Sequence, residues 1–254
     1  MAKIIQDATL QGIADAIRFK TSGTAAIRVD AFASKIREIP TGGVSFEKDI
    51  ITRTISGTYS NDEIKYVGSY AFYLCRVLGA VNFPACTTIY GSAFCSCSSL
   101  TSASFPVCTS IGTSAFYCCT SLTSASFPVC TSIDSSAFYY CSSLTSALFP
   151  VCTTIGSSAF YSCSSLTAAS FPVCTSIGSN AFVNCTKLLS LYLGASTVCQ
   201  LSRSNVFYST PIAGYTESTG GAYGSVFVPA SLVSAYKSAT NWTYFADRIT
   251  AIPE

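Results

Sequence analysis

Cysteine is the residue type that could do most chemistry in this sequence, because 14 cysteines occur among 254 residues and histidine is absent. Thiolates bind zinc, usually as a C-x₂₋₄-C pair that faces a second pair, and an even number of cysteines can form disulfides. The absence of histidine removes the commonest metal ligand and the usual base of nucleophilic triads. Candidate chemistry therefore depends on where the thiols lie.

Thirteen cysteines lie in or beside two regular series, and only Cys199 stands apart. Cys95 and Cys118 are the two that lie next to series members. The series, each with a step of 22 residues, are Cys75, Cys97, Cys119, Cys141, Cys163 and Cys185, and Cys86, Cys108, Cys130, Cys152 and Cys174.

Three interpretations of these thiols compete: buried packing residues, zinc ligands at Cys95/Cys97 or Cys118/Cys119, and disulfides between repeats. An 11-residue step around a coil does not provide a tetrahedral zinc site. Disulfides are within reach, but stacked side chains point in parallel and a reducing compartment opposes oxidation. We expect buried free thiols that pack as small hydrophobes, with neither a metal nor a cofactor.

The acidic residues offer no alternative catalytic centre. Glu47, Asp49, Asp62 and Glu63 are near one another in sequence, but nothing pairs them across a cleft. The G-x-S-x-G elbow, the P-loop and the dinucleotide fingerprint are all absent from the sequence. We therefore expect no enzymatic activity.

The cysteine series belong to a longer repeat that must position every candidate residue. The unit from Cys141 to Ser162 reads C-x-S-L-T-S-A-x-F-P-x-C-T-x-I-G-x-S-A-F-x-x. Six copies are recognisable, and the first and last are degraded, as capping units are. The Ala-Phe rings that follow the same step are Phe72, Phe94, Phe116, Phe138, Phe160 and Phe182.

A 22-residue unit is too short for a helix pair and lies within the leucine-rich-repeat range. Leu144, Ala147 and Phe149 point inward from one short strand, and the second half of the unit returns along the other side. We expect coils stacked about 4.8 Å apart. The sequence predicts a mainly β solenoid of about six coils over residues 67–200.

The unit resembles the Treponema-type, or BspA-like, leucine-rich repeats, which join L-x-x-I-x-L-P to a later I-x-x-x-A-F-x-x-C. Phe-Pro stands here where that family often has Leu-Pro, and Ala147 and its equivalents replace the middle aliphatic residue. The resemblance covers about residues 58–200. It implies a leucine-rich-repeat stack or horseshoe that binds host components or other cells, and it carries over no fixed functional residue.

Residues 1–43 differ from the repeat. The apolar spacing of Leu10, Ile13 and Ile17, and of Phe32 and Ile36, predicts a helical hairpin for attachment or homo-oligomerisation. The runs L-x-x-I-A-D-A-I-R-x-K-T and F-A-x-x-I-R-x-I resemble a short module of phage and prophage proteins of Gram-positive bacteria. This resemblance implies a virion-associated protein.

Two further segments flank the repeat. Residues 44–66 are predicted to form an N-terminal capping strand region, and residues 201–254 a mixed C-terminal cap. In that cap we expect a strand near 225–229, a short helix over 229–238, and Trp242 as a core anchor rather than a ligand-stacking residue. The cap would cover the open end of the stack, where unpaired strand edges otherwise aggregate.

Charge and hydropathy exclude several partners. The net charge is +2 with 10% charged residues, whereas nucleic acid binding needs a clustered basic surface. No apolar run is long enough to insert into a membrane, and the N-terminus lacks the apolar core of a secretory signal peptide. We expect synthesis in the cytoplasm followed by virion association or release, with the cell surface as the alternative.

Tyrosine is the main candidate for ligand contact. Between Arg76 and Lys187 the only charged residue is Asp134, so hydroxyls and aromatic rings must dominate the surface. Tyrosine offers a large contact area at low entropy cost, although packing along the stack is the alternative explanation. The candidate ligand-contact residues are Tyr73, Tyr117, Tyr139, Tyr140 and Tyr161.

These observations predict a non-catalytic adhesion protein. We expect it to be phage virion-associated or tail-associated and to recognise a cell-surface protein or glycan of a bacterium. The alternatives are a bacterial cell-surface adhesin and a passive structural spacer.

Overall fold

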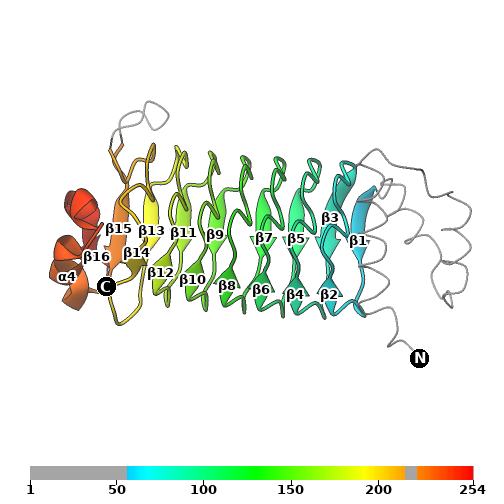
Figure 1. Ribbon diagram of the computed structural model, residues 1–254, viewed down its shortest axis with the longest axis horizontal. Helices are drawn as coiled ribbons and strands as arrows, with labels where there is room; N and C mark the ends of the chain where they lie inside the picture. The colour runs from blue at the N-terminus through cyan, green and yellow to red at the C-terminus, as the bar shows by residue number, and fades with distance from the viewer. Residues whose placement is uncertain (1–55, 215–221, 254) are drawn as a thin grey trace, which may run out of the picture.

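Residues 22 apart in sequence lie beside one another in the computed structural model, which describes residues 56–214 and 222–253. Ile111, Ile133 and Ile155 occupy the same register on successive parallel strands. The coils stack along the long axis of the molecule (Figure 1). The predicted β solenoid is therefore confirmed, whereas the predicted helical hairpin of residues 1–43 lies outside the described residues.

Each regular coil contributes one strand to a first side of the solenoid and one to a second side, and all pairings are parallel. The first side comprises β1 (Gly57–Ser60), β3 (Leu78–Asn82), β5 (Ser102–Ser104), β7 (Ser124–Ser126), β9 (Ser146–Leu148), β11 (Ala168–Ser170), β13 (Ser190–Tyr192), β15 (Ser225–Val228) and β16 (Ile249–Ala251). The second side comprises β2 (Tyr66–Val67), β4 (Thr88–Ile89), β6 (Ser110–Ile111), β8 (Ser132–Ile133), β10 (Thr154–Ile155), β12 (Ser176–Ile177) and β14 (Gln200–Leu201).

The stack is longer than the six coils that the sequence predicts. Within the described residues, the first side holds a sheet of four strands and a sheet of five. The additional rungs come from chain ends that have lost the 22-residue step. Ile177, for example, pairs with Leu201. A longer coil preserves the hydrogen-bonded register but removes the repeat from a search at fixed spacing.

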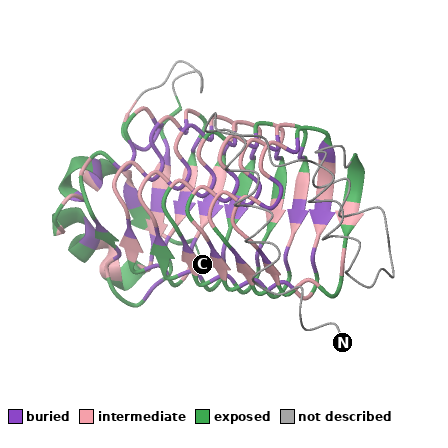
Figure 2. Cartoon of the chain, turned by 45° about the vertical axis from the view of Figure 1, so that its right-hand side comes forward, coloured by how far each residue is buried: buried purple, intermediate pink, exposed green. Residues whose placement is uncertain are grey.

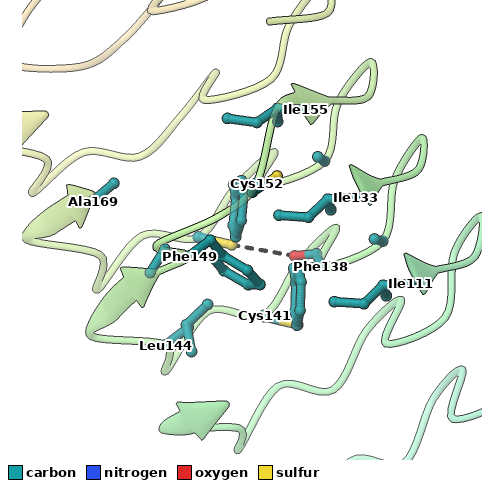
Figure 3. Close-up of a cluster of buried hydrophobic side chains, with 14 of the residues drawn as sticks. Ile111, Ile133, Phe138, Cys141, Leu144, Phe149, Cys152, Ile155 and Ala169 are labelled. Carbon is teal, nitrogen blue, oxygen red and sulfur yellow. Dashed lines mark hydrogen bonds between the residues drawn. The ribbon is translucent and has the colours of Figure 1, made fainter. Parts of the chain in front are cut away.

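The core consists of the same residue types in every coil (Figure 2). The Ala-Phe rings form one column, in which Phe138 stacks on Phe116 and on Phe160 with centroid distances of 5.3 Å. Leu144, Phe149 and their equivalents fill the interior from the first side (Figure 3). Because parallel in-register coils superpose identical side chains, one favourable ring contact recurs along the whole stack.

A third side is formed by the S-A-F-x-x-C segments, which are neither strand nor helix. Ser114 and Cys118 adopt positive φ angles of 56° and 57°, and the equivalent residues of other coils do the same. Tyr117 N–H donates to the Ser114 carbonyl at 3.1 Å, while Phe116 N–H donates to the carbonyl of Ala137 in the next coil at 2.7 Å. The turns therefore satisfy their backbone groups both within a coil and between coils.

Threonine hydroxyls join successive coils at two corners. Thr101 Oγ1 donates to the Gly79 carbonyl at 2.8 Å, and Thr131 Oγ1 to the Thr109 carbonyl at 3.1 Å, each 22 residues earlier. The same bond recurs at Thr87, Thr109, Thr123, Thr145, Thr153, Thr167 and Thr175. These exposed hydroxyls are consequently already engaged by the fold.

The C-terminal segment covers the last coil with η2 (Ala230–Leu232), α4 (Val233–Ser238) and η3 (Thr243–Arg248). Trp242 is fully buried and its Nε1 donates to the Cys199 carbonyl at 2.6 Å. The Cys199 N–H donates to the Tyr236 hydroxyl at 2.9 Å. Trp242 is therefore a core anchor, as expected, and not a ligand-stacking residue.

Candidate ligand-binding surface

Three of the candidate tyrosines form a ladder on the third side. Tyr117 stacks on Tyr139 with a centroid distance of 4.9 Å and an interplanar angle of 5°, and Tyr139 stacks on Tyr161 at 4.6 Å and 6°. All three are half-buried. The ring faces are occupied by neighbouring rings, so the ring edges and hydroxyls remain for contact with a partner.

Tyr140 belongs to the same cluster, whereas Tyr73 does not. Tyr140 is 44% exposed, and its ring centroid lies 4.9 Å from that of Tyr139 in an edge arrangement. Tyr73 packs instead against Tyr70 at 5.7 Å, and Cys95 occupies the coil between Tyr73 and Tyr117. We call Tyr117, Tyr139, Tyr140 and Tyr161 the tyrosine ladder; whether it contacts a ligand stays a prediction.

The tyrosine ladder is electrically neutral. Desolvation raises the pKa of Tyr117, and the nearby Cys118, Cys95 and Tyr140 raise it further. Desolvation also raises the pKa of Tyr139, with added contributions from its neighbours in the stack. The phenols therefore stay protonated at neutral pH and offer hydrogen bonds without charge.

The ladder cysteines are packing residues, as expected. All 14 cysteines lie within the described residues and are free, and only Cys95 and Cys118 are not fully buried. In the first series Cys141 Sγ donates to the Phe116 carbonyl at 3.2 Å, and in the second Cys152 Sγ donates to the Thr154 carbonyl at 3.2 Å. No three potential metal-ligating side chains cluster in this part of the chain.

Burial predicts which thiols react in the native protein. Iodoacetamide should modify Cys95 and Cys118 in the folded chain, because only these two are partly exposed, and reactivity requires access. Mass spectrometry of peptides would locate the label. A thiol titration in denaturant should return about 14 free sulfhydryls. Rapid native labelling of Cys130 or Cys141, or a much lower total, would contradict the buried free thiols.

Sequence reasoning missed two aromatic residues on the first side. Tyr192 of β13 and Phe227 of β15 are half-buried, point outward and stack with a centroid distance of 4.6 Å. Tyr192 stands in register with Ser170, where the regular repeat places serine. The departure from serine at this column was the available signal, but it falls where the 22-residue pattern dissolves.

Stacked parallel coils with a repeated Leu, Phe and Cys core define a leucine-rich-repeat solenoid. The family model for the BspA type leucine rich repeat region matches residues 51–167 and 109–216, with six copies. The chain belongs to this family.

Solved structures of similar proteins support the fold. The leucine rich repeat protein of T. pallidum is 26% identical with a TM-score of 0.52, over 58% of this chain and 72% of that one. A leucine rich cell surface protein of Faecalibacterium prausnitzii is 20% identical with a TM-score of 0.45, over 71% of this chain and 65% of that one. The comparison with curated proteins finds no match. In the described residues, none of the helices has the length and apolar character needed to cross a membrane.

Proposed function

We propose that this protein is a non-catalytic adhesion protein that contacts a bacterial cell-surface protein or glycan through the tyrosine ladder. The observation that carries the proposal is the gathering of four tyrosines from three consecutive coils on an almost uncharged surface. Membership of the BspA type family supports a binding role. Tyrosine supplies large contact area and hydrogen bonds at low entropy cost, as in antibody paratopes.

The stacking favours a particular mode of contact. Aromatic pairs contribute about 0.5–1.5 kcal/mol beyond burial, so Tyr117, Tyr139 and Tyr161 are held in one arrangement before a partner arrives. Preorganised side chains lose little entropy on binding. The partner would meet a row of ring edges and hydroxyls with one rung per coil.

The proposal places the protein on a phage virion or tail, with residues 1–43 as its attachment or self-association segment. The support is the resemblance of that segment to phage and prophage modules of Gram-positive bacteria. The second candidate, a bacterial cell-surface adhesin, is supported by the family alone. A passive spacer is the outcome if the full chain binds no cell.

Replacing Tyr117, Tyr139 and Tyr161 with serine should abolish binding of the labelled full chain to Gram-positive cells, measured by flow cytometry over a panel of strains. Saturable binding that unlabelled protein displaces is expected for the unchanged chain. The loss should exceed about tenfold, as is usual for central aromatic contacts.

The matched control replaces Tyr90, Tyr208 and Tyr244 with serine, because these tyrosines are exposed and lie outside the ladder. Circular dichroism and thermal unfolding would show that both triple variants keep the fold. An unchanged affinity in the ladder variant, or an equal loss in the control, would refute a role of the ladder in binding.

A further inference from the structure

The outward face of the first side carries a second candidate site, distant in register from the tyrosine ladder. Its strands present two residues each to solvent, and the column nearer the strand ends aligns Ser126, Leu148, Ser170, Tyr192 and Phe227. The other column aligns Ser124, Ser146, Ala168, Ser190 and Ser225. We call these two columns the serine face.

The serine hydroxyls of this face differ from the threonine hydroxyls at the corners. Each corner threonine donates to the carbonyl of the preceding coil. By contrast, Ser146, Ser170 and Ser190 have no side-chain hydrogen bond to any other described residue. These hydroxyls are half-buried or exposed, and each can both donate and accept a hydrogen bond. They are available to a ligand without competition from the fold.

A small residue stands between two large ones on this face. Leu148 is 59% exposed, Ser170 follows on the next strand, and Tyr192 on the strand after that. One face of the Tyr192 ring stacks on Phe227 at 4.6 Å and 12°. The opposite ring face is therefore directed along the column toward Ser170 and Leu148, where the short serine side chain leaves it uncovered.

The spacing suits a ring that lies flat against Tyr192. Leu148 and Tyr192 are two strands apart, which corresponds to about 9.6 Å between their backbones. A ring between two walls needs about 3.5–4 Å of contact distance on each side. Ala168, the other outward residue of β11, is as short as Ser170, so the floor below such a ring is low across the whole strand.

We propose that the serine face binds a neutral pyranose residue of a glycan between Tyr192 and Leu148, above Ser170 and Ala168. The C–H groups on the sugar ring faces would contact the Tyr192 ring and the Leu148 side chain. Its hydroxyls would exchange hydrogen bonds with Ser146, Ser170 and Ser190. The strands β9, β11 and β13 contain no charged residue, so nothing there would pair with an anionic ligand.

The same face fits a protein partner poorly. The centres of protein–protein interfaces are enriched in apolar and aromatic residues and in arginine, whereas this face is mostly serine. Arg248, in the next rung, already lies over the Tyr223 ring at 3.8 Å. The saccharide site lies on a different side from the tyrosine ladder and goes beyond the proposed adhesion function.

The test is calorimetric titration of the full chain with three neutral probes: cellotetraose, mannotetraose and chitotetraose. We expect saturable binding of at least one of them. Tyr192→Ala should weaken that binding by about tenfold or more, as removal of a central aromatic contact does. Ser170→Tyr should abolish it, because the new ring would extend the Tyr192–Phe227 stack into the space for the sugar.

Two controls separate this proposal from misfolding and from the adhesion proposal. Tyr208→Ser removes a tyrosine that is 68% exposed elsewhere and should leave sugar binding unchanged, and thermal unfolding should show that Ser170→Tyr folds. The variant with serine at 117, 139 and 161 should bind the oligosaccharide normally even if it no longer binds cells. Absence of binding to all three probes, or binding that survives both Tyr192→Ala and Ser170→Tyr, would overturn the inference.

Discussion

Raising the pH from about 9 to about 11 is expected to unfold the solenoid, because its core contains many thiols that ionise only when exposed. Burial raises the pKa of the Cys86 thiol to about 11, and burial raises those of Cys108 and Cys152 to about 12. Burial likewise raises the pKa of five further thiols, those of Cys97, Cys119, Cys130, Cys141 and Cys185.

The direction follows from proton linkage. A thiol whose pKa is higher in the folded chain binds its proton more tightly there, so its stabilising contribution is complete below the unfolded pKa of about 9. Above that pH the unfolded chain releases protons that the folded chain retains. Each such thiol removes about 1.4 kcal/mol of stability per pH unit. Eight together remove on the order of 10 kcal/mol per unit, comparable to the whole stability of a typical domain.

Urea titrations at half-unit intervals between pH 6 and pH 11 would measure this dependence under reducing conditions. The free energy of unfolding should change little up to about pH 8 and then fall steeply. Replacing Cys108, Cys130 and Cys152 with alanine should reduce the slope above pH 9 by about 4 kcal/mol per unit. A stability that stays constant up to pH 11 would show that the thiols are not buried as described.

Phe138→Ala should destabilise the protein by about 3–5 kcal/mol, the usual cost of removing a fully buried phenylalanine. The ring contacts neighbours in both directions along the stack, Phe116 and Phe160, at 5.3 Å each. It also meets Phe127 at 6.1 Å and Phe149 at 6.0 Å. Because each coil is stabilised only by its neighbours, loss of a central ring should also broaden the unfolding transition.

Urea unfolding of three variants would test this expectation. Phe138→Leu retains most of the buried volume and should cost less than Phe138→Ala. Tyr139→Ala removes the adjacent half-buried ring and should cost only about 1–3 kcal/mol for its two stacked partners. If Phe138→Ala were no more destabilising than Tyr139→Ala, the phenylalanine column would not be the main stabilising contact between coils.

Much of the core was readable from spacing alone. A residue that recurs every 22 positions occupies the same place in every coil, so the columns of Phe, Ile and Cys indicated the buried positions directly. The exclusion of bulky charges from residues 77–186 also followed from the sequence, with Asp134 as the exception. Trp242 was identified as a core anchor because the end of any solenoid needs apolar cover.

The neighbours of each column were decided only by the tertiary structure. A fixed step says which residues stack, but the cross-section of a coil depends on backbone angles such as the positive φ of Cys118 and Tyr140. Those angles bring Tyr140 against Tyr139, and an intervening cysteine separates Tyr73 from both. Periodicity carries no information of this kind.

The difference between serine and threonine also required the structure. Both residue types read as surface hydroxyls in the sequence, yet the corner threonines donate to carbonyls of the preceding coil while the strand serines do not. The aromatic pair Tyr192 and Phe227 lies where coil lengths change, so only the hydrogen-bonded register aligns it with Ser170. The sequence thus determined the repeat and its buried columns, and three-dimensional register decided which surface groups are free and adjacent.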